Sequence, residues 1–505
     1  MSGKSNFVDY EPLRNDRGAT TANEDDSDFR KARRQEVENE FTIPRKTVAV
    51  PNEPTFTSAP TTGVDQDLRA SSTPSSIISP VRPGQSSTTA TAIFGSFVLK
   101  GGHAVSFAGL FLFTFLVFFR PYEWSPSLLW LSKGALITAI ATLLIFLPTQ
   151  MGLENRLTLR TREVNMVLIL LVLGLLSIPL ATDRLLAWNS FVEFLKVVAM
   201  FVVMVNVLRT RGRLRLLWLL ILAASLVLSV NAIMDYRAGR MMLGGNRIAG
   251  AIGGLFENPN DLALHLVTFL PIVIVLGLAA KNPFSKLVYW LAALTIVGGT
   301  VVTFSRGGFL GLLVVIATLS WRLVKQNRPI VIVVVGLLLA GFLVLAPGAY
   351  RDRISTTADD SANARTGELK RSLYITLRHP IVGVGMDNFV VFSNTAHATH
   401  NAYTQVSSEI GIPAAIIYVM FLIAAVKRVK GIPHPREMEG KKKELSYLAI
   451  GIHASLIGYM VTSFFASVAY LWYVYYLAAY AISVSRFWEA TASEEIVSKP
   501  SVHSI

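Results

Sequence analysis

Long apolar segments recur along the chain from about residue 93 to residue 487, with short polar stretches between them. Each approaches the length of about 20 residues that an α-helix needs to cross the hydrocarbon core of a bilayer. About twelve such segments are expected, over residues 104–119, 128–147, 165–182, 188–208, 214–234, 260–279, 287–304, 308–324, 329–346, 404–426, 444–464 and 468–487. The pattern therefore predicts an all-α polytopic membrane protein.

The loops between these segments alternate between strongly basic and nearly uncharged. The basic ones lie near residues 156–162, 209–215, 281–286, 322–328 and 427–443. Because cytoplasmic loops carry an excess of Lys and Arg, these loops and both chain termini are expected in the cytoplasm. The long polar stretch at about 347–411 then lies on the other side of the membrane, where we expect any chemistry to take place.

The alternation divides the chain into three regions. Residues 1–92 are rich in Ser, Thr, Pro and acidic residues, so they are expected to form a disordered cytosolic tail. A motif that docks a partner is the alternative for this tail. No apolar core with a small-residue cleavage site follows Met1, so no cleaved signal peptide is expected. Residues 93–487 are expected to form the membrane domain, and residues 488–505 a cytosolic C-terminal tail.

Composition agrees with a membrane protein, since 52% of the residues are hydrophobic and only 16% are charged. The chain has no cysteine, which excludes disulfides and thiolate metal ligands. The net charge of +14 indicates membrane orientation and contact with anionic membrane lipids, rather than nucleic-acid binding.

The segment that opens at His400 contains the strongest candidate for a catalytic base. Histidine titrates near neutral pH, and at the mouth of a helical bundle it suits proton abstraction from a hydroxyl. The alternative is an interfacial histidine that caps a helix. Gly411 and Pro413 interrupt the segment, so a short outer-face helix is expected to abut the span at 404–426. His397 and His400 have the spacing of two metal ligands on one helix face, but no third ligand is evident, so no metal site is predicted.

Arg306 lies in the run Ser305-Arg306-Gly307-Gly308 between two apolar spans. An arginine at the rim of a hydrophobic bundle is costly unless it pairs with an anion. Its planar fork matches phosphate oxygens, and the glycines beside it would let a ligand approach closely. The alternative is that the side chain reaches out to the lipid headgroups.

Further basic residues follow on the same polar stretch, namely Arg365, Lys370, Arg371 and Arg378. Most are expected on a solvated surface, and one or two could reach inward. The run Gly383-Val384-Gly385-Met386-Asp387-Asn388 faintly resembles a dinucleotide fingerprint, but it lacks the third glycine and the strand–helix setting. A tight turn is expected there.

The run Asn258-Pro259-Asn260 precedes the span at 260–279. Asn258 or Asn260 can cap the helix, and Pro259 suits its first turn. The helix amides exposed at this end could also face an anion.

Together, four blocks resemble the O-antigen ligase and polymerase superfamily of bacterial inner membranes. In order, they are Phe256–Ala263, Ser305–Gly308, Arg365 with Gly383–Phe389, and His400–Tyr403 with Glu409–Gly411. The resemblance covers about residues 245–425. It implies a glycosyltransferase C-like membrane fold with a large periplasmic loop. It also implies transfer or polymerisation of an undecaprenyl-pyrophosphate-linked glycan onto an acceptor hydroxyl. The pathway implied is the biosynthesis of a surface polysaccharide, an exopolysaccharide or lipopolysaccharide.

The resemblance also implies roles for individual residues. His400 would activate the acceptor, and Arg306 and Arg365 would bind and neutralise the pyrophosphate. Supporting roles would fall to Asn260, Asn401, Tyr403 and Glu409. Since arginines can stabilise a departing pyrophosphate, the implied enzyme is metal-independent, needs no cofactor and inverts the anomeric centre. The acceptor would be a glycan or a lipid.

Two functions from other classes remain as alternatives. A transporter of small, bicarbonate-like anions should place ionisable residues at the bilayer midplane. Here such positions are almost free of charge, and Lys133, Glu193 and Lys196 are the exceptions. A non-catalytic scaffold for envelope assembly would use the N-terminal tail to bind polysaccharide-assembly partners.

Overall fold

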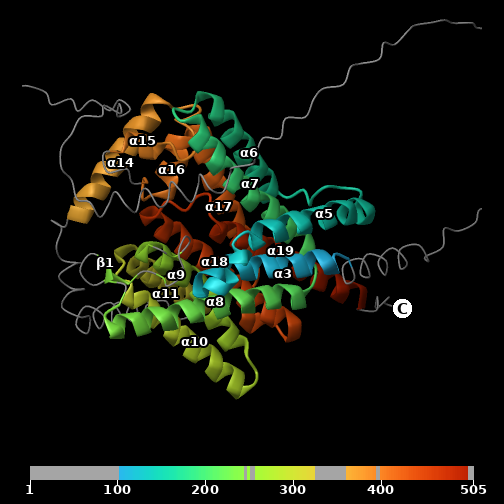
Figure 1. Cartoon of the computed structure of the whole chain (residues 1–505). Helices are drawn as coiled ribbons and strands as arrows, with labels where there is room; N and C mark the ends of the chain where they lie inside the picture. The colour runs from blue at the N-terminus through green and yellow to red at the C-terminus, as the bar shows by residue number, and fades with distance from the viewer. Residues whose placement is uncertain are drawn as a thin grey trace, which may run out of the picture. The chain divides into compact units, whose positions relative to one another are not determined.

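The computed structural model describes residues 102–240, 242–243, 247–248, 250, 256, 258–324, 360–393 and 398–498. These residues belong to one compact helical unit (Figure 1). The predicted span at 329–346, the tail at 1–92 and His397 lie outside the described residues.

Helices account for nearly all of the described chain. The first half contains α3 (Ala104–Phe119), α4 (Pro121–Trp124), η1 (Pro126–Leu131), α5 (Gly134–Glu154), α6 (Arg162–Ser177), η2 (Ile178–Leu180), α7 (Arg184–Val207) and α8 (Arg211–Ala238). The second half contains α9 (Pro259–Ala279), α10 (Pro283–Val302), α11 (Arg306–Leu323), α14 (Asp360–Arg378), α15 (Phe389–Phe392), α16 (Ala402–Glu409), α17 (Ile412–Lys430), η4 (Pro435–Glu437), α18 (Gly440–Thr462), η5 (Ser463–Phe465) and α19 (Trp472–Ser498).

Two very short strands, β1 (Met242–Leu243) and β2 (Arg247–Ile248), precede α9. They pair antiparallel, with Met242 opposite Ile248 and Leu243 opposite Arg247.

Ten stretches of the described chain are long and apolar enough to cross a membrane, judged by length and composition. They contain α3, α5, α6, α7, α8, α9, α10, α11, α17 and α18. The predicted fold class, an all-α polytopic membrane protein, is thereby confirmed. The predicted span at 468–487 corresponds to α19, which is not among the ten. Its first half carries four tyrosines, which lower its hydropathy: Tyr473, Tyr475, Tyr476 and Tyr480.

The predicted span at 404–426 is wrong in its first third. The short helix α16 ends at Glu409, and the span α17 starts only at Ile412. Gly411 has a φ of 100° and Pro413 stands in the first turn of α17, so the chain changes direction between the two helices. The short helix expected next to this span is confirmed.

Several helix starts are set by local side-chain caps, including the one expected at Asn258 or Asn260. The capping side chains accept hydrogen bonds from the first helical amides, and belong to Thr161, Asp183, Thr210, Asn258, Asn282 and Ser305. Such caps satisfy amides that have no partner within the helix. Helix boundaries are therefore largely a local property of this sequence.

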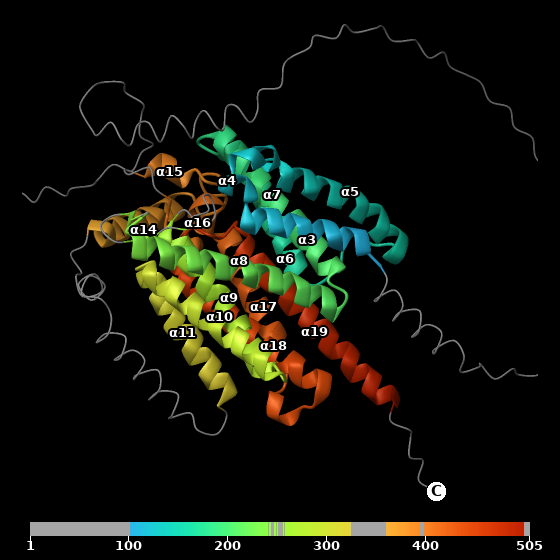
Figure 2. The same cartoon turned by 60° about the horizontal axis from the view of Figure 1, so that its bottom comes forward.

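The most buried span is α9, which packs against α18, α10 and α11 (Figure 2). Glycines permit the close approach of these helices. A Cβ on Gly451 of α18 would lie 2.5 Å from Val275 Cγ2 of α9, and one on Gly311 of α11 would lie 2.1 Å from Thr462 Cγ2. Small residues at helix contacts are typical of packing in membranes, where dispersion forces replace the hydrophobic effect.

The polar stretch between the spans folds, where it is described, as the helices α14, α15 and α16. In both views these helices gather at one end of the bundle, next to the start of α17 (Figures 1 and 2). Thr376 Oγ1 of α14 and Ser407 Oγ of α16 share a hydrogen bond of 2.9 Å. This group of short helices therefore forms a polar layer at the bundle end where the candidate site lies.

Candidate functional site

His400 immediately precedes the cap of α16. Its backbone is left-handed, with φ at 50°, and its side chain is half-buried. The capping residue is Asn401, whose Oδ1 accepts hydrogen bonds from Tyr403 N (2.9 Å) and Thr404 N (3.1 Å). The alternative role for His400, as the helix cap, is therefore wrong. A non-glycine residue in the left-handed region is uncommon, and such residues cluster at functional sites.

The two neighbours of His400 hold it in this conformation. Thr399 Oγ1 donates to the backbone oxygen of Asn401 at 3.0 Å. The same hydroxyl lies 3.0 Å from Ser467 Oγ, in the connection between α18 and α19. Both Thr399 and Asn401 are buried, so the backbone on either side of the histidine is fixed by tertiary contacts.

The starts of α9 and α11 are joined by a buried hydrogen bond. Ser305 Oγ donates to Asn260 Oδ1 at 2.8 Å, and Ser305 Oγ also accepts a hydrogen bond from Gly308 N at 3.2 Å. Asn258, not Asn260, caps α9, since its Oδ1 accepts from the Asn260 amide at 2.9 Å. Arg306 is therefore the first residue of a helix whose start is fastened to α9.

The glycines beside Arg306 serve helix packing. A Cβ on Gly308 would lie 2.5 Å from Ala263 Cβ of α9, and one on Gly307 would lie 2.8 Å from Phe465 Cβ. The expectation that these glycines leave room for a ligand is wrong, because protein atoms occupy the space that a side chain would fill.

Tyr403 connects α16 to the end of α18. Its hydroxyl donates to Met460 O at 2.7 Å, and its ring lies 6.2 Å from that of Phe464. Burial raises the pKa of the Tyr403 hydroxyl, which therefore stays a neutral donor. Phe464 packs in turn on Phe465, the residue in contact with Gly307. The turn η5 thus lies between the start of α16 and the start of α11.

These contacts bring sequence-predicted residues from three separate helix starts to one end of the bundle. They are Asn260 on α9, Arg306 on α11, and His400, Asn401 and Tyr403 at α16. The segments span more than a hundred residues of sequence. The turn η5 contacts the starts of α11 and α16, and the Ser305–Asn260 hydrogen bond joins α11 to α9.

Glu409 lies at the other end of α16 and is almost fully buried. Burial raises the pKa of its carboxyl well above the ordinary value, and the Asp387 carboxylate raises it further. Asp387 also accepts from Ser190 Oγ of α7 at 3.4 Å, and the Tyr470 hydroxyl lies close to Glu409. Glu409 therefore belongs to a buried polar cluster behind the site, and is neutral over a wider pH range than an exposed carboxyl.

The tight turn expected within residues 383–388 is confirmed, because the Asn388 amide donates to Gly385 O at 3.1 Å. Gly383 and Gly385 have φ values of 71° and 100°, and a Cβ on Gly383 would lie 2.4 Å from Glu409 C. The amides of Val384 and Gly385 donate to Ser408 O (3.0 Å) and Glu409 O (2.9 Å). The turn thus satisfies carbonyls at the C-terminal end of α16, which a helix leaves without partners.

Asn388 fastens the same turn to the start of α7, a contact that the sequence did not predict. Its Oδ1 accepts from Asp183 N at 2.6 Å, and its Nδ2 donates to Asp183 O and Met386 O, each at 3.0 Å. Asn388 is fully buried. The position of α16 is therefore set by α7 as well as by α18.

Arg365 lies in the second turn of α14 and is half-buried. The contact of α14 with α16 at Thr376 lies eleven residues further on, or about 16 Å along the helix axis. This contact alone does not bring Arg365 beside His400.

Arg371 is the basic residue of this group that reaches inward. It is 7% exposed, and its Nη1 donates to Phe392 O at 2.7 Å. The nearby Glu368 carboxylate accepts from Ser393 Oγ at 2.8 Å. Arg371 therefore anchors the segment that follows α15, whereas Lys370 and Arg378 are exposed as expected.

The charged positions inside the spans do not form a buried pathway. Lys196 donates to Glu193 at 2.5 Å, one turn away on α7, and both side chains are substantially exposed. Lys133 stands at the N-cap of α5, outside the apolar part of the helix. These residues give little support to a transport site at the bilayer midplane.

One known family model matches part of the chain. Residues 291–419 match the family model described as O-Antigen ligase. The matched region contains Arg306, Arg365 and His400, and begins after Asn260. No curated protein matches the chain. The match supports glycan transfer of the O-antigen ligase type and implies a lipid-linked glycan substrate. Residues 291–419 are therefore an O-antigen ligase-type domain, in a multi-pass membrane protein whose described residues include ten candidate spans.

Proposed function

We propose that this protein transfers or polymerises an undecaprenyl-pyrophosphate-linked glycan onto an acceptor hydroxyl at the periplasmic face of the inner membrane. The observation that carries the proposal is the joining of three helix starts, α9 to α11 by a hydrogen bond and α11 to α16 through η5. Asn260 is hydrogen-bonded to Ser305, the residue before Arg306. Tyr403, three residues after His400, is hydrogen-bonded to Met460. A base and a phosphate-binding cation are thereby held at one end of a membrane-embedded bundle.

The basic ends of two helices support this orientation. α11 starts at Arg306 and has Arg322 in its last turn, and α17 starts next to α16 and has Lys427, Arg428 and Lys430 in its last turn. Basic helix ends favour the cytoplasmic side. The site would then face the periplasm, where a lipid-linked donor is presented and ATP is absent.

In the proposed reaction an imidazole nitrogen of His400 accepts the proton of the acceptor hydroxyl. The acceptor oxygen forms a bond to the anomeric carbon as the bond from that carbon to the pyrophosphate oxygen breaks. Attack from the face opposite the leaving group inverts the anomeric centre. A base with this role contributes about 10²–10⁴-fold to the rate.

Arg306 is the proposed partner of the leaving pyrophosphate, with Arg365 as a second cation. A guanidinium presents two parallel donors that match phosphate oxygens. It can stabilise charge that develops on the leaving group without a metal ion. Arg306 is well suited because its helix start is fixed by the Ser305–Asn260 hydrogen bond.

The remaining predicted residues would act through position. Asn401 fixes the turn that presents His400, Asn260 fixes the start of α11, and Tyr403 fixes α16 against α18. Glu409 would keep the far end of α16 in place. A precisely supported constellation is what catalysis by positioning requires.

The test is a transfer assay with purified full-length protein, a pyrophosphate-linked glycan donor and an acceptor. His400→Ala should lower the transfer rate by about 10²–10⁴-fold with normal accumulation in the membrane. Chelator should leave wild-type turnover unchanged. Product length separates the two acceptor classes, since a polymerase makes a ladder of repeat units and a ligase makes a single addition.

A second variant separates the effect of the imidazole from the effect of the left-handed backbone at residue 400. Asn tolerates the left-handed region better than Ala does, so His400→Asn relieves backbone strain but supplies no base. We expect His400→Asn to be as inactive as His400→Ala. Recovery of transfer in His400→Asn would show that the backbone, not the imidazole, matters. Inhibition of the wild type by chelator would instead support the alternative metal site at His397 and His400.

A further inference from the structure

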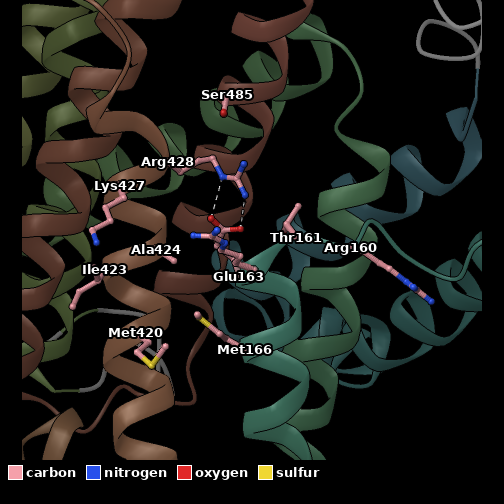
Figure 3. Close-up of a pocket in the computed structure, with 11 residues that line it drawn as sticks. Arg160, Thr161, Glu163, Met166, Met420, Ile423, Ala424, Lys427, Arg428 and Ser485 are labelled. Atoms are coloured by element: carbon pink, nitrogen blue, oxygen red, sulfur yellow. Dashed lines mark hydrogen bonds and ion pairs between the residues drawn. The ribbon is translucent and has the colours of Figure 1, made fainter.

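A cavity of about 860 Å³ lies between α6 and α17 (Figure 3). Its lining includes Lys427, which lies 15 residues along α17 from Ile412, or about 22 Å along the helix axis. His400 and α16 lie beyond the other end of α17. The cavity therefore has no part in the proposed transfer site.

The rim of this cavity is strongly cationic. Four basic residues and one acidic residue line it: Arg160, Arg162, Lys427, Arg428 and Glu163. Arg428 is engaged with Glu163, through Nε to Oε1 at 3.0 Å and Nη2 to Oε2 at 2.7 Å. Figure 3 shows this pair bridging the two helices, with Arg160 and Lys427 directed to opposite sides.

The other three cations are exposed, and within the described residues they form no ion pair. Because Glu163 is 2% exposed and both of its oxygens are used by Arg428, it does not offset them. Arg160, Arg162 and Lys427 thus surround one cavity with uncompensated positive charge.

The wall of the cavity changes from charged to apolar along the two helices. One to three turns from the charged rim, it is formed by Met166 of α6 and by Met420, Ile423 and Ala424 of α17. Met420 and Ile423 are 45% and 40% exposed, so this apolar wall is accessible from the cavity. Both helices belong to candidate membrane spans, whose ends carry the cations.

A ligand that matches both parts must be anionic at one end and apolar at the other. We propose that this cavity binds an anionic phospholipid, with its phosphate between Arg162 and Lys427 and an acyl chain along Met166 and Met420. A free phosphate or nucleotide would use the cations but would make no contact with the methionine wall. The Glu163–Arg428 pair holds α6 and α17 together behind the headgroup, so the two helices present a preformed site.

The test is lipid retention by the purified full-length protein, measured by native mass spectrometry with phosphatidylglycerol and with phosphatidylcholine. The double variant Arg162→Ala, Lys427→Ala removes two rim cations. Each basic residue near an anionic surface contributes about a factor of 5, so phosphatidylglycerol binding should fall by about 30-fold. The matched control, Lys441→Ala with Lys443→Ala, removes two exposed charges of α18 outside the cavity and should change binding less than about 3-fold.

A second pair of variants tests the apolar wall without altering charge. Met420→Trp fills the cavity and should also reduce phosphatidylglycerol retention. Met151→Trp places the same ring at a similarly exposed methionine of α5, outside the cavity, and should leave retention unchanged.

Other results would overturn the proposal. Equal losses in the two double variants would mean that general surface charge holds the lipid. Displacement of phosphatidylglycerol by equimolar glycerol phosphate would mean that the cavity is a site for soluble phosphate. Retention of phosphatidylcholine as strong as that of phosphatidylglycerol would exclude selection by charge.

Discussion

The two ends of α17 are held in place by different forces. At its start, α16 is fixed by neutral hydrogen bonds, from the Asn401 cap to the Tyr403–Met460 and Thr376–Ser407 contacts. Near its other end, α17 is fixed to α6 by the Arg428–Glu163 ion pair, among further cations. Neutral contacts position a site without adding charge to it. Charged contacts at the opposite end leave a surplus that suits a membrane surface.

The largest expected effect concerns Arg306, which lies at the bundle end where α17 starts, called here the neutral end. Arg306→Lys keeps the charge but loses the planar fork, so the transfer rate should fall by about 10- to 100-fold. Transfer kinetics with the lipid-linked donor measure this. Lys370→Ala, which removes an exposed charge on α14, is the control and should change the rate less than about 2-fold. Equal losses in both variants would indicate a diffuse electrostatic role.

The neutral end should also be sensitive to backbone geometry. A Cβ on Gly411 would lie 2.2 Å from Ile381 O, and the residue has a φ of 100°. Gly411→Ala should therefore destabilise the junction of α16 and α17 by about 2 kcal/mol or more, and lower the thermal midpoint by several degrees. Gly367→Ala, within α14 where a Cβ meets nothing within 4 Å, should be neutral or slightly stabilising. An unchanged midpoint for Gly411→Ala would mean that the junction is free to relax.

The charged end can be probed through its ion pair. Glu163→Gln leaves Arg428 without its carboxylate, and should lower stability by about 1–3 kcal/mol without changing the transfer rate. Glu193→Gln breaks the exposed pair with Lys196, and should cost less than about 1 kcal/mol. Thermal unfolding in the same detergent compares the two. A loss of transfer activity in Glu163→Gln would contradict the separation of the two ends.

The smallest expected effect concerns Glu409. Its folded-state pKa is raised by burial and by Asp387, so its contribution to stability is fully present below the unfolded pKa and is lost as pH rises towards the folded pKa. Glu409→Gln has no ionisable carboxyl at this position, so it removes the loss of stability at high pH. The variant should therefore gain thermal stability relative to wild type at pH 8 but not at pH 4. A stability difference independent of pH would mean that Glu409 is ionised in the folded protein.

Hydropathy and local capping were readable before the fold was known. The apolar lengths predicted the described spans, and Gly383 and Gly385 predicted a turn, because these properties depend on neighbours in sequence. The glycines beside Arg306 were misinterpreted, since their packing partners Ala263 and Phe465 are distant in sequence. Which of the basic residues of α14 reaches inward could not be predicted for the same reason, because the partner of Arg371 is a carbonyl on another segment.

The sequence by itself determined the membrane class, most helix boundaries and the residue types available for chemistry. Only the tertiary structure decided that Ser305 bonds Asn260, that η5 joins α11 to α16, and that Glu163 pairs with Arg428. Helix formation depends on residues within about four positions of each other, whereas these contacts join residues 45 to 265 positions apart. Which polar side chains meet is set by how the apolar helices pack, and many packings are compatible with the same hydropathy pattern.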